Sequence, residues 1–213
     1  MPNRKLIGKG AEGELFLTEH DKQKCVEKIR VSKAYRHPEL DKRLRKRRTV
    51  REAKVIRAAR AAMINCPTLL VENVEKSTLI IEYIEGELLA RVLVKENPIS
   101  AKSIDLCGQA GIILGKLHQN KITHGDFTTS NLMVDTKNKV RVIDFGLSEQ
   151  TDGVEQKAVD VMLFERSLSD VDDNSILFKE FLKQYLSVDK KADEIIARTK
   201  LILSRGRYRS KGQ

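Results

Sequence analysis

Two short polar segments of this 213-residue chain restrict its possible folds more than any other feature. The first, HGDFTTSN, places Asp126 five residues before Asn131. The second, VIDFG, brings another carboxylate, Asp144, thirteen residues after Asn131. Carboxylate and amide oxygens are hard ligands that suit Mg²⁺ between phosphate groups. A fold that gathers these three side chains would form a site for phosphoryl chemistry.

A glycine-rich segment near the N-terminus fits the same chemistry. Residues 8–13, GKGAEG, match the pattern G-x-G-x-x-G. Glycine lets the backbone approach phosphate oxygens and present its N–H groups to them. A strand-like segment, ELFLT, follows where a dinucleotide-binding turn would open a helix, so a hairpin loop folded over a nucleotide is favoured. Taken alone, the pattern fits an ordinary glycine-rich hairpin equally well.

Two further charged residues complete the pattern. Lys28 lies on the third predicted strand, and Glu52 lies on a long predicted helix. A lysine that holds phosphates and a helix glutamate that positions it are the second part of such a site. Either residue alone would be interpreted as half of a surface ion pair. Five elements in this order, each on the expected strand, helix or loop, favour the functional interpretation over chance.

Apolar periodicity divides the chain into a strand-rich part and a helical part. Residues 4–31 alternate as three short strands, and residues 67–86 read as two more strands around a polar turn. Between them, residues 38–63 read as one long helix. Its predicted apolar stripe consists of Leu40, Leu44, Val50, Ala53 and Ile56.

After Gly86 the pattern becomes helical. Ser100 is the predicted N-cap of a helix that follows Pro98, and residues 131–146 read as a hairpin that turns at 136–139. Three closing helices are predicted over residues 153–169, 174–187 and 190–205. We therefore predict an α+β fold of two lobes, with an N-lobe at 1–84, a reduced C-lobe at 85–204 and a mobile basic tail at 205–213.

The chain is strongly basic, with a formal charge of +10 and a pI near 9.5, which favours an anionic partner. Seven lysines and arginines lie within residues 42–51, and the tail adds four more. Such a run is most often a solvated helix face, but two in one chain favour contact with an RNA backbone. Few aromatic residues flank them, so base-specific readout is not predicted. The candidate RNA or partner contacts are Arg43, Arg47, Arg48, Arg205, Arg207 and Arg209.

Cysteine usage and hydropathy bear on the compartment. The three cysteines are far apart and lack a CxxC spacing, which argues against a disulfide framework or zinc site and favours a reducing compartment. No apolar run approaches the roughly 20 residues that span a bilayer, and the N-terminus lacks the apolar core of a signal peptide. We predict a cytoplasmic protein without a membrane partner.

The chain resembles the protein-kinase-like superfamily and, more narrowly, the small atypical kinase subunit of the KEOPS complex. The resemblance covers almost the whole chain. It implies a minimal two-lobed protein-kinase-like fold, ATP and Mg²⁺ as cofactors, and atypical serine/threonine kinase or ATPase activity in tRNA threonylcarbamoyladenosine (t6A) formation. The implied partners are tRNA, the threonylcarbamoyl-transferase subunit and a small regulatory subunit. The segments that carry the resemblance are GAEGELF, SKAYRHPELDKRLRKRRTVREAKVI, THGDFTTSN, VIDFGLSEQTDGVEQKAVDVMLFERSL and RGRYRSKG.

The resemblance also implies a role for each matching residue. Asp126 would be the catalytic acid/base, and Lys28 would hold the α- and β-phosphates while paired with Glu52. Asn131 and Asp144 would bind the metal. Asp160 would brace the catalytic loop, and His124 is interpreted as a scaffold residue of that loop rather than a catalytic base. The remaining implied nucleotide contacts are the phosphate-covering loop Gly8, Lys9, Gly10, Ala11, Glu12 and Gly13, the adenine-stacking Val26 and Met133, and the adenine-binding backbone of Glu82 and Ile84.

The chain also departs from regulated kinases. Gly125 stands where they have an arginine that answers an activation-loop phosphate, and no A-P-E follows Asp144. Only 67 residues remain after Gly146. These departures predict no phosphate switch of that kind and little surface for peptide substrates.

Three alternative functions stay open. They are a pseudokinase scaffold that binds tRNA or a partner, a RIO-like kinase, and a small-molecule phosphotransferase. A competent residue at every catalytic position argues against the scaffold. The shortness of the chain leaves no room for the extra helices that a small-molecule kinase needs.

Overall fold

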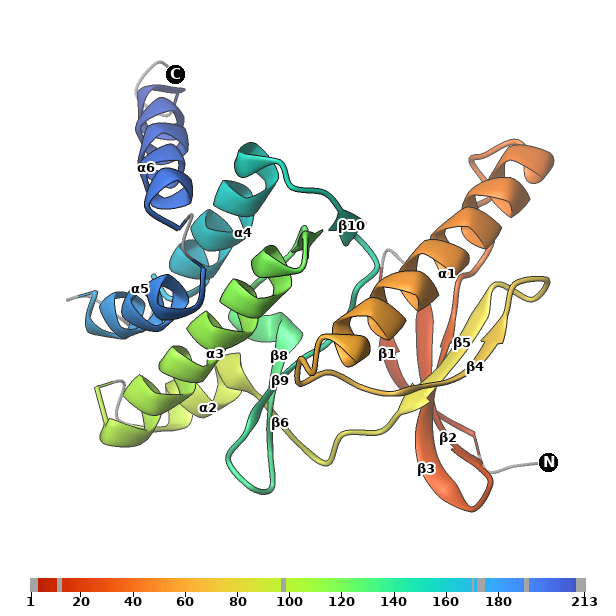
Figure 1. The fold of residues 1–213 in the computed structure, drawn as a ribbon. Coiled ribbons are helices and arrows are strands. Elements are labelled where there is room, and N and C mark those ends of the chain that lie inside the picture. Colours follow the sequence, from red (N-terminus) through yellow and green to blue (C-terminus); the bar gives the residue numbers. More distant parts are fainter. Residues whose placement is uncertain are drawn as a thin grey trace.

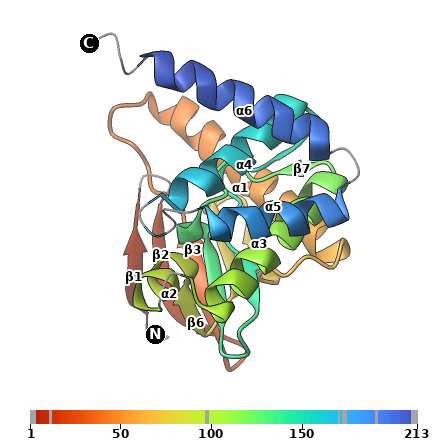
Figure 2. The same cartoon turned by 90° about the vertical axis from the view of Figure 1, so that its left-hand side faces the viewer.

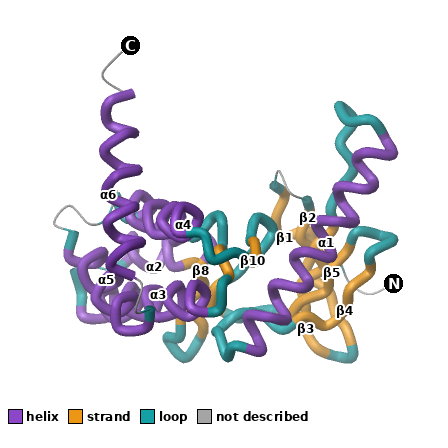
Figure 3. The backbone as a smooth tube through the Cα atoms, turned by 45° about the horizontal axis from the view of Figure 1, so that its top comes forward, coloured by secondary structure: helices purple, strands orange, loops and turns teal. Residues whose placement is uncertain are grey.

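The computed structural model describes residues 4–10, 13–96, 99–169, 171, 175–189 and 192–209, with side chains as far as Leu203. The chain forms a strand-rich part and a helical part, which lie side by side in Figures 1 and 3. It passes from one to the other through residues 83–85. The predicted α+β, two-lobed fold is confirmed.

The N-terminal part is an antiparallel sheet of five strands in the order β1-β2-β3-β5-β4. Lys28 on β3 pairs across the backbone with Leu15 on one side and Leu79 on the other. The register of the central strand β3 with both neighbours therefore fixes the position of this lysine along the sheet. The strands are β1 (Lys5–Lys9), β2 (Glu14–His20), β3 (Gln23–Ile29), β4 (Leu69–Asn73) and β5 (Thr78–Glu82).

Helix α1 (Pro38–Ala61) packs its C-terminal half against this sheet, while its N-terminal half extends beyond it (Figure 1). The predicted apolar stripe is correct at Ala53 and Ile56, which are buried. It is wrong at Leu40 and Val50, which are 42% and 44% exposed. The first half of the inward face is polar instead, because Asp41, 0% exposed, is bound by ion pairs rather than by apolar contacts.

The C-terminal part is built around helix α3 (Ala101–Gln119), and the Ser100 side chain accepts the Ser103 N–H at 3.1 Å as the predicted N-cap. The hairpin and the three closing helices are also confirmed, whereas β6 and α2 had no distinct sequence signal. The elements are β6 (Gly86–Leu88), α2 (Leu89–Lys95), β7 (Ile122–Thr123), a 3₁₀ turn (Thr129–Asn131), β8 (Leu132–Asp135), β9 (Val140–Val142), β10 (Glu149–Gln150), α4 (Val154–Ser167), α5 (Ile176–Val188) and α6 (Ala192–Arg209).

The main core lies where α3 crosses α5 and α4 (Figure 2). A Cβ at Gly111 would collide with the Phe181 carbonyl, so glycine permits the close approach of α3 and α5. The rings of Phe164 and Phe181 stack with centroids 4.1 Å apart. Phe127, next to Asp126, packs beside them and is fully buried. The hydrophobic core thus anchors the segment that carries the candidate site.

Helix α6 continues to Arg209, so residues 205–209 are helical, contrary to the predicted mobile tail. The loss of apolar periodicity after residue 204 predicts the end of the helix there. Periodicity reports burial of one face, however, and arginine and tyrosine are acceptable residues on a helix without burial. Lys211 lies outside the described residues. In the part of the chain that the structure describes, no helix has the length and apolar character to cross a bilayer.

Candidate active site

A cavity of about 480 Å³ lies between the two parts of the chain. Its volume falls in the range of small-molecule sites, which is roughly 300–1,000 Å³. Ile7 and Leu15, which flank the glycine-rich loop, line it from the sheet side. Eight residues predicted from the sequence also line it, namely Val26, Lys28, Glu52, Glu82, Ile84, Asn131, Met133 and Asp144.

The glycine-rich loop closes as a tight turn between β1 and β2. The Gly10 N–H donates to the Gly13 carbonyl at 3.0 Å. A Cβ at Gly13 would collide with the Ile29 carbonyl of β3, so this position requires glycine. Gly8 and Lys9 belong to β1, and the Lys9 ammonium pairs with Glu14 at 3.1 Å. The predicted contacts Ala11 and Glu12 lie outside the described residues.

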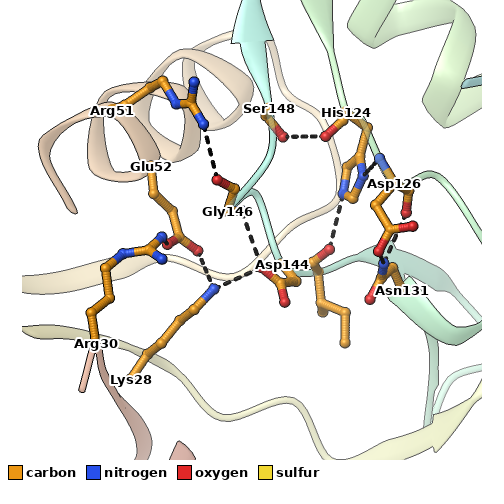
Figure 4. Close-up of polar contacts among 11 residues, drawn as sticks. Lys28, Arg30, Arg51, Glu52, His124, Asp126, Asn131, Asp144, Gly146 and Ser148 are labelled. Atoms are coloured by element: carbon orange, nitrogen blue, oxygen red, sulfur yellow. Dashed lines mark hydrogen bonds and ion pairs between the residues drawn. The ribbon is translucent and has the colours of Figure 1, made fainter. Parts of the chain in front are cut away.

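Three charged side chains meet on the sheet side of the cavity (Figure 4). The Lys28 Nζ donates to Glu52 Oε1 at 2.7 Å and to Asp144 Oδ1 at 2.6 Å. Burial alone would lower the pKa of Lys28, but the carboxylates of Glu52 and Asp144 outweigh it and raise that pKa. Burial would likewise raise the pKa of Asp144, but the Lys28 ammonium lowers it. Lys28 and Asp144 are therefore both charged near neutral pH.

Two arginines complete this cluster, and sequence reasoning assigned neither of them to the site. The Arg30 guanidinium donates to Glu52 Oε2 at 2.5 Å. Arg51, the residue before Glu52 on α1, donates to the Gly146 carbonyl at 3.2 Å (Figure 4). It also donates to Glu149 at 3.2 Å. A usable signal existed for Arg30, because it follows Lys28 by two residues and so shares its face of the strand. Arg51 was masked by the basic run around it.

The opposite side of the cavity is the loop that carries Asp126 and Asn131. The Asn131 Nδ2 donates to Asp126 Oδ2 and to the Asp126 carbonyl, both at 2.8 Å. Because the amide nitrogen is used in this way, the amide oxygen is the atom that Asn131 can offer to a metal. The loop thus orients its acid and its predicted metal ligand together.

His124 and Asp160 hold this loop from behind. The Asp126 N–H donates to His124 Nδ1 at 3.3 Å, so Nε2 carries the hydrogen that is donated to the Ile143 carbonyl at 3.0 Å. Both ring nitrogens are thereby used in structural bonds, as predicted for a scaffold residue. The buried Asp160 carboxylate accepts the N–H groups of His124 and Gly125, both at 2.7 Å. These bonds confirm the predicted bracing role of Asp160.

Gly125 has a conformation that an arginine would not adopt readily. Its φ is +78°, and a Cβ would lie 2.7 Å from the Leu147 carbonyl oxygen. The segment after Asp144 is held by direct contacts instead. Ser148 Oγ donates to the His124 carbonyl at 2.9 Å, and β10 pairs with β7. This segment is thus ordered without any added charge.

The predicted basic surface is smaller than the sequence suggested. At least three of its seven residues form ion pairs within the chain, since Arg45 pairs with Asp41, Lys46 with Glu75 and Arg51 with Glu149. Lys42, Arg43 and Arg47 are exposed, and Arg48 is half-buried. The backbones of Arg205, Arg207 and Arg209 lie in α6, but their side chains are outside the described set.

The chain was compared with known proteins. The family profile described as Protein kinase domain matches residues 2–167. The KEOPS complex subunit Bud32 of Pyrococcus abyssi is 37% identical over 217 residues, which cover 97% of both chains. The EKC/KEOPS complex subunit bud32 of Dictyostelium discoideum is 33% identical over 96% of this chain and 83% of that protein.

A longer relative is also similar. The probable bifunctional tRNA threonylcarbamoyladenosine biosynthesis protein of Methanococcus vannielii is 32% identical over 207 residues. The match covers 96% of this chain but only 36% of that protein. The kinase-domain match covers most of the chain, and the matches to the two shorter relatives are nearly complete. Both agree with a cavity whose lysine, glutamate, asparagine and aspartate lie as the kinase resemblance predicts. The chain therefore belongs to the protein kinase family and, within it, to the group of KEOPS subunit Bud32 proteins.

Proposed function

We propose that this chain binds ATP and Mg²⁺ in the cavity between its lobes and transfers or hydrolyses the terminal phosphate. It would act as the kinase-like subunit of a KEOPS assembly in t6A formation on tRNA. One observation carries the proposal. The ion-paired Lys28, Glu52 and Asp144 face the same cavity as Asn131, which is hydrogen-bonded to Asp126.

The residues present fit a nucleotide with its metal. Asn131 and Asp144 offer an amide oxygen and a carboxylate, and Mg²⁺ in such sites usually takes one or two protein ligands together with phosphate oxygens and water. When bound, the ion would offset the charge of the β- and γ-phosphates. Val26, Ile81 and Met133 give the cavity apolar walls, between which the adenine would stack.

The roles of the chain's own residues follow from their contacts. Lys28 would hold phosphate oxygens with its ammonium group while Glu52 keeps the side chain oriented. Asp126 would orient the attacking hydroxyl or water and accept its proton. Since Asn131 binds one Asp126 oxygen, the rotation of this carboxylate is fixed.

The chemical output that we propose is narrow. A serine or threonine hydroxyl of this chain or of one bound partner, or water, would be the phosphate acceptor. The segment from Asp144 to α4 spans residues 144–153 and is held close to the loop that contains His124. It offers little surface on which a free peptide could dock, so we expect generic peptides to be phosphorylated slowly. The proposed assembly partners are the threonylcarbamoyl-transferase subunit, the small regulatory subunit and tRNA, in the cytoplasm.

Asp126→Ala tests the enzymatic proposal. Loss of a positioned acid/base reduces turnover by roughly 10²–10⁴-fold, so ATP turnover with tRNA and the transferase partner present should fall by about that factor. Asp105→Ala, which removes an exposed carboxylate of α3, is the matched control and should keep full turnover. Equal turnover in wild type and Asp126→Ala would reject the mechanism. Normal t6A formation by the Asp126→Ala protein, despite its loss of turnover, would favour the scaffold instead.

We also propose that the exposed residues Lys42, Arg43 and Arg47 of α1 contact the tRNA backbone. Arg48 of the same helix, and Arg205, Arg207 and Arg209 at the end of α6, are proposed as further contacts. Reversal of the three exposed charges to Glu should weaken tRNA binding and reduce its salt slope by about 3, because each lost phosphate contact removes about one unit.

A matched triple reversal at Lys121, Lys137 and Lys139 controls for overall charge, since these exposed residues lie in the C-lobe. It changes the net charge by the same amount, and we expect the salt slope to stay close to that of wild type. An equal loss in both triple variants would reject a local contact on α1.

A further inference from the structure

The buried charges beside the cavity include a second cation, Arg30, in addition to the lysine that would bind phosphate. Glu52 is 2% exposed and accepts from two cations at once, with Lys28 on Oε1 at 2.7 Å and Arg30 on Oε2 at 2.5 Å. Arg30 is itself 3% exposed. A second buried charge on the same carboxylate is costly to desolvate, and its retention needs a physical reason.

The position of Arg30 ties several elements together. Its backbone N–H donates to the Ser77 carbonyl at 3.1 Å, just before β5, so its main chain is fixed. Its guanidinium reaches from the end of β3 to the middle of α1 (Figure 4). A Cβ on Gly146 would lie 3.6 Å from a guanidinium nitrogen of Arg30, so the segment after Asp144 also passes close by.

The two cations differ in what they can do when a ligand arrives. Lys28 is a flexible point charge that also contacts Asp144, and it can turn toward phosphate oxygens. If Lys28 were its only partner, Glu52 would then become a buried carboxylate with a weakened ion pair, which is strongly destabilising. The planar guanidinium of Arg30 can keep Glu52 paired throughout.

We propose that Arg30 is a positioning residue for the phosphate-binding lysine, an inference that rests on the function proposed above. Arg30 holds Glu52 and α1 in place independently of Lys28. This leaves Lys28 free to exchange Asp144 for a phosphate without a shift of the helix. The ion pair between α1 and the sheet is then permanent, which suits a chain whose segment after Asp144 is ordered without a phosphate.

The test compares ligands with and without phosphates. Calorimetric titration with Mg·ATP and with adenosine should be done on wild type, Arg30→Met, Arg30→Lys and the control Arg57→Met. Arg57 lies on the same helix but pairs with Glu72 at the exposed edge of the sheet. We expect Arg30→Met to lower the affinity for Mg·ATP by about 10-fold, equivalent to one charged hydrogen bond, and to leave adenosine affinity within about twofold.

The outcomes separate positioning from general stability. A residue that merely stabilises the fold would change both affinities together or neither. Arg30→Lys should recover part of the Mg·ATP affinity because it restores the charge but not the planar fork. It also serves as the test if Arg30→Met does not fold. In a Lys28→Ala background, Arg30→Met should change the Mg·ATP affinity no further.

Two results would overturn the inference. The first is a ratio of Mg·ATP to adenosine affinity that is the same in both Arg30 variants as in wild type. This result would reject the positioning role of Arg30 and leave the proposed function intact. Absence of Mg·ATP binding by the wild-type chain, alone and with its transferase partner, would overturn the proposed function and the inference with it.

Discussion

The two sides of the cavity are held in place by different kinds of interaction. On the sheet side, Lys28, Arg30, Glu52 and Asp144 hold one another through side-chain ion pairs. On the helical side, the loop from His124 to Asn131 is held mainly by its backbone, whose N–H groups at His124 and Gly125 donate to the single buried carboxylate of Asp160. Asp126 thus needs no charged partner to be positioned.

This difference separates the side of the cavity that changes from the side that stays fixed. Ion pairs between long side chains can exchange partners, and Lys28 must release Asp144 before either group can serve a nucleotide or metal. Backbone hydrogen bonds to a buried acceptor cannot exchange without local unfolding. The helical side is therefore preorganised, and the sheet side adapts to the ligand.

The largest effect that would test this contrast is expected from Asp160→Ala. The fully buried carboxylate accepts the buried His124 N–H and the part-buried Gly125 N–H, and it contacts the buried His118 Nε2 at 3.2 Å. Each buried donor left unpaired costs about 1–3 kcal/mol, so the free energy of unfolding should fall by roughly 3–5 kcal/mol. Urea unfolding measures this loss.

The control for Asp160→Ala is Asp193→Ala, which removes an exposed acid from the first turn of α6. It should change the free energy of unfolding by less than about 1 kcal/mol, as expected for a surface helix-terminal charge. A loss at Asp160 no larger than this would show that the loop is not braced from behind.

A smaller effect is expected from Gly125→Ala, which tests the backbone of the same loop. The left-handed φ costs a residue with a Cβ about 1–2 kcal/mol, and the new Cβ would press on the Leu147 carbonyl at 2.7 Å. We expect the free energy of unfolding to fall by about 2–3 kcal/mol. We also expect ATP turnover to fall, because Asp126 is the next residue.

Gly10→Ala is the comparison for stability. Gly10 lies in the glycine-rich loop, where no atom of the described residues comes within 4 Å of the position that a Cβ would take, and its φ is not left-handed. Its thermal unfolding midpoint should match that of wild type within about 2 °C, since surface changes are usually within about 0.5 kcal/mol. Equal stability losses in the two variants would contradict the special status of Gly125.

Several features could be read from the sequence because they depend on residue type and local spacing. The order of the glycine loop, the lysine, the helix glutamate and the polar residues Asp126, Asn131 and Asp144 predicted the fold and eight of the residues that line the cavity. The Ser100 cap also followed from local spacing, because a serine that precedes a helix can accept an N–H of its first turn.

Other features depend on three-dimensional partners that no local pattern reveals. Leu40 looked like a core residue, but it lies in the half of α1 that extends beyond the sheet. Val50 also looked like one, but it is exposed, and the buried side of α1 near it carries Thr49, Glu52 and Ala53 instead. Arg51 looked like a member of a basic surface, and Arg30 had no predicted role, until the fold placed Glu52, Gly146 and Glu149 beside them. A charge is recognised as structural only when its partner, distant in sequence, is known.

The smallest expected effect is a pH dependence of the free energy of unfolding that arises on the helical side of the cavity and not on the sheet side. His118 is buried between α3, α4 and α5, where its ring contacts Tyr185 Oη at 2.7 Å and Asp160. Burial lowers its pKa, and Lys157 adds to this, although Asp160 and Asp189 oppose the shift. On the sheet side, the raised pKa of Lys28 and the lowered pKa of Asp144 move both titrations away from neutrality.

The direction of the pH effect follows from linkage. The unfolded chain protonates His118 near pH 6.5, whereas the folded chain resists, so stability present above about pH 6.5 is lost as the pH falls. The Lys28 contribution is complete below an unfolded pKa of about 10.4 and is lost only as pH rises through its folded pKa. The Asp144 contribution is present above about pH 3.9 and is lost below it. Of these three groups, His118 alone should respond between about pH 5 and 9.

Urea unfolding of wild type and His118→Gln at pH 7.5, 6.5 and 5.5 measures this response. The wild-type free energy of unfolding should fall between pH 6.5 and 5.5 by at most about 1.4 kcal/mol more than that of the variant, the limit for one proton per pH unit. Glutamine keeps a polar side chain near Asp160 and Tyr185 but cannot titrate. The same pH dependence in both proteins would mean that another group titrates, and the ion-paired sheet side would then be the first place to search.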